Sequence, residues 1–396
     1  MLVMSGYNVI DRIFIGRGVG SDAIAGLTIT FPVMNLSAAL GVLVGAGAAA
    51  RVSIHLGAGQ QREASYVLGN TLVMILIIAT LYISCFAIWL DPILRMFGAS
   101  DNTLPYARDF MQWILPGMLV MNIMFSFNNV MRASGYPTLA MVTMLIGAGA
   151  NLILAPIFIF VLDMGIRGAA IATDIAMLIS AIFVMAHFCN RKSTLHFTRG
   201  IYRLQWPVVI SIISIGAAPS LVNAASSAIN AIINTTLAQY GDNAIAAAGI
   251  FGTYTSLICM VIVGMCQGMQ PIVGYNYGAG RTDRAVATFW LTVAVGTVLS
   301  TVGGAGGLLL PEYISAAFTI DRQLIDVTTN ALSISLTMFW VVGFQIVSTN
   351  YFMSIGMAGK SIFLSLTRQV IFLIPFLLLL PRLLGLNGVW WSFPAS

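Results

Sequence analysis

Long stretches without a charged residue dominate the sequence. They cover residues 23–50, 64–90, 110–131, 133–162, 204–241, 243–280, 285–311 and 327–359. Only 8% of all residues are charged, against about 25% in soluble domains. A transmembrane helix needs roughly 20 apolar residues, so each stretch can cross a bilayer. Backbone groups in lipid must bond internally, and the two-residue alternation of barrel strands is missing. The chain is therefore predicted to be an all-α polytopic membrane protein.

We predict twelve transmembrane helices, six in each half of the chain. The spans are expected at residues 1–16, 23–54, 66–90, 104–131, 138–162, 166–189, 207–238, 244–277, 285–310, 324–355, 361–380 and 385–396. A basic linker over residues 191–206 then separates an N-terminal six-helix bundle, residues 1–190, from a C-terminal six-helix bundle, residues 207–396.

The two halves repeat each other at a spacing of 221 residues. The Gly-Ala-Gly segment at 57–59 returns at 278–280, and Gly135 matches Gly356. Six spans per half give both halves the same orientation in the membrane. This pattern predicts a parallel repeat, a plan that many membrane transporters share, with the substrate path between the copies.

Lysine and arginine are divided unequally between the two sides of the predicted membrane. The linker carries Arg191, Lys192, Arg199 and Arg203. The same side also holds Arg51, Arg62, Arg132, Arg281, Arg284, Lys360 and, near it, Arg368. Cytoplasmic loops are enriched in these residues, so the linker is predicted to be cytoplasmic.

The repeat also makes both ends of the chain short. The seventh span begins near Trp206, so its counterpart in the first half would begin before residue 1. The last span is shorter than its counterpart, which runs to about residue 189. We expect the first and last helices to be truncated relative to a complete transporter.

Four kinds of segment resemble the multidrug and toxic compound extrusion (MATE) family, and its MepA-like bacterial branch in particular. They are residues 7–16, the two Gly-Ala-Gly loops, residues 132–137 and residues 385–394. The resemblance implies two six-helix bundles facing a central cavity, in a bacterial cytoplasmic membrane. It also implies export of organic cations and amphipathic drugs or metabolites, by antiport against protons or sodium with alternating access.

The resemblance further implies an ion-coupling site in the first bundle. Asp11 matches the family's first-helix Asp, Asn151 its fifth-helix Asn and Thr173 its sixth-helix Thr. The family's second Asp is Ala155 here, which weakens a sodium site because a hard cation prefers several oxygen ligands. Asp174 is another source of a carboxylate. We expect a proton or sodium ion to act at Asp11, Asn151, Thr173 and Asp174, with Asp11, Asn151 and Thr173 forming any sodium site.

Each carboxylate also has a structural interpretation. A carboxylate at mid-bilayer costs about 2.5–3.5 kcal/mol on insertion scales, so such residues are usually paired or functional. Asp11 can be an interfacial residue paired with Arg12, and Asp174 can be bonded to a polar group such as Asn151. In the second half, Ile232 corresponds to Asp11, so coupling is expected in the first bundle.

Several uncharged polar residues in the spans are candidates for the substrate cavity. They are Asn8, Asn35, Asn128, Asn129 and Gln345. Hydrogen bonding between neighbouring helices explains such residues equally well, so both interpretations stay open.

The sequence offers no arrangement typical of an enzyme. Paired carboxylates, a metal cluster and an activated nucleophile at usable spacing are missing, so we expect neither an enzyme nor a cofactor. We expect a monomer in the lipid bilayer that binds a small-molecule drug or metabolite and no nucleic acid. Two alternatives stay open: a lipid-linked saccharide flippase and an inactive truncated remnant. A flippase cavity should favour cationic side chains for a pyrophosphate, whereas the arginines of this chain are expected at span ends.

Overall fold

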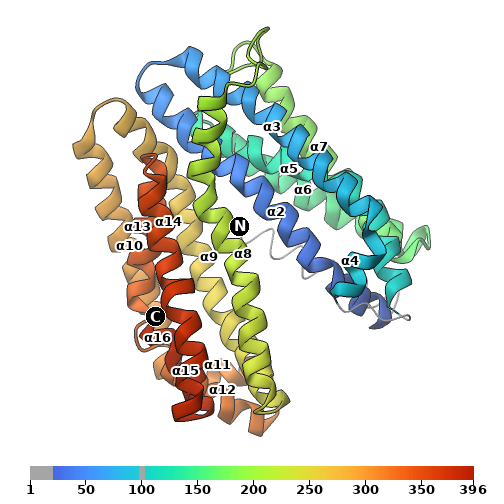
Figure 1. Ribbon diagram of the computed structural model, residues 1–396, viewed down its shortest axis with the longest axis vertical. Coiled ribbons are helices and arrows are strands. Elements are labelled where there is room, and N and C mark those ends of the chain that lie inside the picture. Colours follow the sequence, from blue (N-terminus) through green and yellow to red (C-terminus); the bar gives the residue numbers. More distant parts are fainter. Residues whose placement is uncertain (1–20, 98–102) are drawn as a thin grey trace. The chain divides into compact units, whose positions relative to one another are not determined.

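The computed structural model describes residues 21–97 and 103–396, with side chains from residue 29 onward apart from Ser227. Within these residues every regular element is a helix (Figure 1). The first predicted span, with Asn8 and Asp11, lies outside the described residues. The prediction of an all-α polytopic membrane protein is confirmed.

The helices follow the predicted spans closely. In the first half they are α2 (Ser21–Gly57), α3 (Gln61–Ile88), α4 (Leu90–Met96), α5 (Leu104–Ala133), α6 (Pro137–Pro156) with the π-helical η1 (Ile157–Val161), and α7 (Gly165–Cys189). In the second half they are α8 (Trp206–Ala238), α9 (Asp242–Gly278), α10 (Thr282–Leu309), α11 (Pro311–Phe318), α12 (Arg322–Ser335), α13 (Trp340–Ser354), α14 (Ala358–Leu366), the π-helical η2 (Thr367–Leu373), α15 (Ile374–Leu384) and α16 (Leu386–Ala395).

Nine helical stretches of the described part are long and apolar enough to cross a membrane. The number is ten if α12 and α13, which meet at a 60° bend, form one broken span. These ten coincide with predicted spans two to eleven. The ten-residue helix α16 coincides with the twelfth.

Contacts divide the chain into two compact units. The first extends to Ser220 and includes Tyr277–Gly280, and the second comprises Leu221–Asn276 and Arg281–Ser396. The division falls inside α8, because the first part of that helix packs closely on α2. Gly216 lies against the backbone of Leu43. Small residues allow such a close approach of two helix backbones.

In the first unit the predicted linker is hydrogen-bonded to the N-terminal part of α3. Gln61 Nε2 donates to the carbonyl of Thr194 over 2.7 Å. Asn70 Nδ2 donates to the carbonyl of Arg203 over 3.2 Å, and Asn70 Oδ1 accepts from the backbone N–H of Gln205 over 2.9 Å. The linker is therefore an ordered part of this unit.

In the second unit α10 and α13 meet through two glycines. A Cβ atom added at Gly343 would lie 2.6 Å from the carbonyl carbon of Gly296 and 2.7 Å from the Ser300 hydroxyl oxygen. Ser300 also donates to the carbonyl of Trp340 over 3.0 Å. The close contact leaves no room for a side chain at position 343.

We predict that Gly343→Val destabilises the protein because its side chain must push α10 and α13 apart. Overpacking of this kind costs about 1–3 kcal/mol. Thermal unfolding of the purified protein in detergent measures the effect. Gly249→Val is the matched control, because a Cβ atom there meets nothing within 4 Å. Equal melting temperatures for the two variants would contradict the close α10–α13 contact.

Candidate functional site

Most charged side chains of the spans lie near a helix end, where water or a partner is available. At the start of α5 and α7, Arg167 Nε lies 3.0 Å from the Asp109 carboxylate. At the start of α5, Arg108 Nε donates to Asp91 over 2.8 Å. Asp91 and Asp109 thus each have an arginine partner.

Asp174 is different, because it lies deep within a span. It is the tenth residue of α7, so it lies about 14 Å along the helix from Gly165 at 1.5 Å per residue. The side chain is half-buried. Among the described residues no arginine, lysine or histidine forms an ion pair with it. Intramembrane carboxylates of this kind are costly and commonly functional.

The Asp174 carboxylate lies directly on Gly117 of α5. It accepts a hydrogen bond from the Gly117 backbone, and a Cβ atom at position 117 would overlap with the carboxylate. The preceding residue is Pro116, inside α5. Proline lacks an N–H and clashes with the preceding turn, so it disturbs the regular hydrogen bonding of the helix. Gly117 thus provides both the space and a backbone hydrogen bond for this carboxylate.

Asn151 and Thr173, predicted as parts of the ion-coupling site, are in direct contact. Asn151 Nδ2 donates to Thr173 Oγ1 over 3.0 Å, and Thr173 Oγ1 donates to the carbonyl of Ala169 over 3.0 Å. Asn151 is 4% exposed. Neighbouring residues on a helix point about 100° apart, which explains why Thr173 faces α6 while Asp174 faces α5.

Ala155 occupies the position of the family's second carboxylate. It is fully buried, in an apolar cluster that includes Ile159 and Ile166. The cluster offers no oxygen ligand at this position. Within the described residues no group of three or more His, Cys, Asp or Glu side chains is placed to hold a metal ion.

The predicted cavity residues occupy varied positions, and their role stays a prediction. Asn35 is exposed on α2. Asn128 is 1% exposed, and its Nδ2 donates to the Ala140 carbonyl over 2.7 Å, which ties α5 to α6.

The other two cavity candidates, Asn129 and Gln345, also form hydrogen bonds within the protein. Asn129 donates to the carbonyl of Phe125 over 3.0 Å and accepts from Arg132. Gln345, in the second unit, donates to the Leu364 carbonyl over 3.3 Å and so links α13 to α14.

The sequence reasoning missed a buried polar network in the first unit. Tyr82 and Ser37 share a hydrogen bond of 2.7 Å between their hydroxyl oxygens. Asn122 Nδ2 donates to Ser37 Oγ over 3.1 Å. The network joins α2, α3 and α5. A signal was present, because Asn122 lies within the charge-free stretch over 110–131.

The expectation that arginines lie at span ends is wrong for Arg368. The elements α14, η2 and α15 form one span, Ala358–Leu384, and Arg368 lies well inside it. The sequence does not reveal the depth of Arg368 in the span, because Lys360 and Arg368 interrupt the apolar pattern where the span begins.

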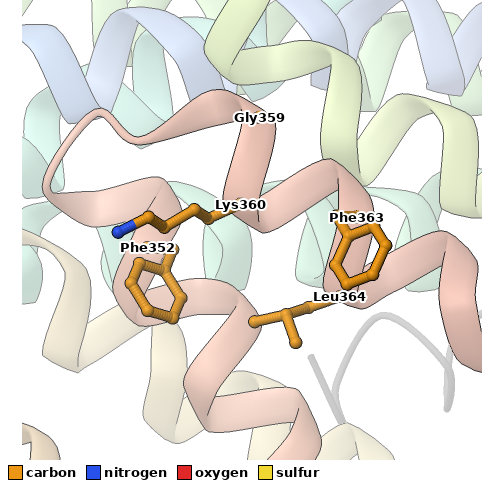
Figure 2. A pocket seen from close by; sticks show the side chains of 5 residues that line it. All are labelled: Phe352, Gly359, Lys360, Phe363 and Leu364. Carbon is orange, nitrogen blue, oxygen red and sulfur yellow. The ribbon is translucent and has the colours of Figure 1, made fainter.

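A small cavity opens at the start of α14. Its volume is about 340 Å³, and Phe352, Gly359, Lys360, Phe363 and Leu364 line it (Figure 2). Lys360 Nζ lies 5.4 Å from the centroid of the Phe352 ring. A cation over an aromatic face is attracted by the ring quadrupole. None of the predicted site residues lines this cavity.

The fold, with a carboxylate deep inside a span, is that of a polytopic helical membrane protein. The MatE family model matches residues 1–157 and 219–379, and the chain belongs to this family. It is therefore a multi-pass membrane transporter of a multidrug-efflux family.

Named relatives agree with this assignment. Over 394 residues the chain is 26% identical to the multidrug export protein MepA of Staphylococcus aureus (strain MSSA476), covering 98% of this chain and 85% of that protein. Over 390 residues it is 28% identical to MepA of Staphylococcus haemolyticus (strain JCSC1435), with the same coverage.

Solved structures show the same fold. The MATE multidrug transporter DinF-BH in complex with R6G is 36% identical, with a TM-score of 0.91, over 100% of this chain and 89% of that one. An outward-facing multidrug resistance MATE family transporter of the MOP superfamily matches with a TM-score of 0.91 at 23% identity, over 100% of this chain and 89% of that one. The twelve-helix plan of two bundles follows from these matches.

We predict that Gly117→Ala displaces the Asp174 carboxylate, because its methyl group would occupy the same space. The variant should unfold at a lower temperature, with a cost of about 1–3 kcal/mol. Gly149→Ala on α6 is the control, since a Cβ atom there meets nothing within 4 Å. Thermal unfolding in detergent compares the two. A Gly117→Ala variant as stable as the control would exclude the close seating of Asp174 on α5.

Proposed function

We propose that this protein exports organic cations, or other amphipathic drugs and metabolites, by antiport against a cation. The observation that carries the proposal is the deep carboxylate of Asp174, held at Gly117 without a cationic partner among the described residues. The Asn151–Thr173 hydrogen bond, which joins α6 to the residue beside Asp174 on α7, supports it. Membership of a multidrug-efflux family supports the export part of the proposal.

A carboxylate at this depth suits a coupling role for a physical reason. Low-dielectric surroundings favour its protonated form, and contact with water or a cation favours its ionised form. A conformational change that alters access to water therefore changes the proton or cation affinity of the site. Such a group couples ion binding to the state of the transporter.

The proton is a better coupling ion for this site than sodium. Sodium requires several oxygen ligands, as hard cations do. Asn151 and Thr173 supply two side-chain oxygens, while Ala155 supplies a methyl group inside an apolar cluster. A proton needs a single carboxylate, which Asp174 or Asp11 provides.

The transport cycle follows from differential affinity. Drug binds the state open to the cytoplasm, and the two bundles then rock to the outward state. Protonation of the first bundle there lowers the affinity for drug, which is released. Coupling of this kind requires that drug and ion favour different states. The protein acts as a monomer in a bacterial cytoplasmic membrane, with the basic linker on the cytoplasmic side.

A first prediction concerns the coupling ion. In vesicles that hold the full chain and a fluorescent organic cation, an imposed pH gradient should drive transport of the dye. A sodium gradient at constant pH should not, because Ala155 offers no ligand. Asp11→Asn, which removes the first-helix carboxylate, should abolish the response to pH. Unchanged transport and ion dependence in Asp11→Asn would refute the coupling role of Asp11.

A second prediction concerns Asp174. Asp174→Asn keeps the shape of the side chain but cannot ionise, so pH-driven transport should fall by at least tenfold, which corresponds to ~1.4 kcal/mol in a barrier. Asp109→Asn is the control, because Asp109 is part of an ion pair near the membrane surface, and exposed pairs contribute about 0–1 kcal/mol. Initial rates of dye transport measure both. Equal rates in the two variants would remove Asp174 from the mechanism.

A further inference from the structure

Arg368 lies at the depth of the hydrocarbon core. Its span, Ala358–Leu384, carries Lys360 near one end and Arg382 near the other. At 1.5 Å per residue, Arg368 lies about 12 Å along the helix from Lys360 and about 21 Å from Arg382. The hydrocarbon core is about 30 Å thick. Lys360, which lies beside Phe352 (Figure 2), and Arg382 can therefore lie at the two interfaces, while Arg368 cannot.

Within the described residues the guanidinium of Arg368 has no counter-charge. Its one electrostatic neighbour there is the thiol of Cys259 on α9. The carboxylates of the second unit all lie at or just after the start of a helix. They are Asp242, Asp283, Glu312, Asp321 and Asp326. A charged residue inside a membrane is costly and normally has a partner. An arginine at this depth is therefore expected to pair with an anionic group.

The local backbone also singles out this position. Arg368 lies in the π-helical segment η2 (Thr367–Leu373), and π-helical turns inside α-helices frequently occur at functional sites. The next residue, Gln369, has a buried side-chain oxygen without a hydrogen-bond partner. Arg368 itself is half-buried. The site is therefore deep and polar, and the guanidinium lies in it without a counter-charge among the described residues.

The chemistry of the ligand follows from the guanidinium. It is planar and always charged, and it carries five N–H donors in a fixed fork that matches the two oxygens of a carboxylate or phosphate. The Cys259 thiol is a weak donor and acceptor and does not replace such a ligand.

We propose that Arg368 binds the acidic group of a transported amphipathic molecule. This inference rests on the proposed export function and names a substrate class for it: amphiphiles that carry a carboxylate or phosphate-type anion, zwitterions included. A molecule that has both a cationic and an anionic group can then use a different part of the protein for each.

Two dyes with one ring system test the proposal. Rhodamine 19 carries a free carboxylate, and R6G is its ethyl ester, so the pair differs at the group that Arg368 would bind. Fluorescence polarisation of each dye with the purified full chain gives its dissociation constant. Arg368→Gln should weaken rhodamine 19 binding by at least about tenfold, the size expected for loss of a charge-assisted hydrogen bond. R6G binding should stay nearly the same.

Two further variants separate recognition from folding. Arg368→Lys keeps the charge but loses the fork, so its affinity for rhodamine 19 should lie between those of the wild type and Arg368→Gln. Arg382→Gln removes an exposed arginine from the same span and should bind both dyes as the wild type does. The proposal is overturned if the wild type does not bind rhodamine 19. It is also overturned if Arg368→Gln changes the affinities for both dyes equally or changes neither.

The same dyes separate a transported ligand from a lipid headgroup. Nanodiscs of phosphatidylglycerol and of phosphatidylcholine should give the same affinity for rhodamine 19. Loss of this affinity in the anionic lipid, in the wild type only, would make Arg368 a lipid site and overturn the proposal. Ion-driven transport of R6G is a separate readout. If R6G transport persists while Arg368→Gln leaves the affinity for rhodamine 19 unchanged, antiport stands and the inference fails. If rhodamine 19 binds through Arg368 but no gradient moves either dye, the inference stands and antiport fails.

Discussion

The exclusion of water from the membrane interior governs this structure. Most buried backbone and side-chain polar groups therefore bond to a partner within the protein. Helices satisfy the backbone, and glycines bring two helices close enough for side chains to reach a neighbouring carbonyl. Ser300, beside the Gly343 contact, bonds to the Trp340 carbonyl, and Asn128 bonds to the Ala140 carbonyl. Much of the polar content of the spans therefore connects helices.

The same constraint explains what could be predicted from the sequence. Uninterrupted apolar stretches reveal spans because the membrane admits little else, and predicted spans two to eleven coincide with helices. The prediction was weaker where a charge interrupts a span. The sequence pattern predicts Arg368 close to the cytoplasmic end, whereas the helix continues through it in a π-helical segment. The 60° bend between α12 and α13 likewise leaves no break in the apolar pattern.

The candidate site was likewise predictable only in part. The contact between Asn151 and Thr173 was expected, because the family resemblance supplied both positions. The contact of the Asp174 carboxylate with Gly117 was not expected, because it depends on how α5 and α7 are aligned. No pattern within one helix records that alignment. For the same reason Asn128, a candidate for the cavity, could not be distinguished in the sequence from a residue that ties two helices together.

The internal repeat gives the two halves one scaffold but not one set of charges. The second-half counterpart of Thr173 is Phe393, which packs on the Phe251 ring with centroids 4.8 Å apart. Conversely, the first-half counterpart of Arg368 in the repeat is Gly147, among other small residues. Among the described residues, the first unit thus holds a deep negative charge at Asp174 and the second a deep positive charge at Arg368. Antiport requires that ion and substrate bias the equilibrium between two states in opposite directions. Under the proposed antiport, charges of opposite sign in separate units would allow both ligands to do so without competing for one group.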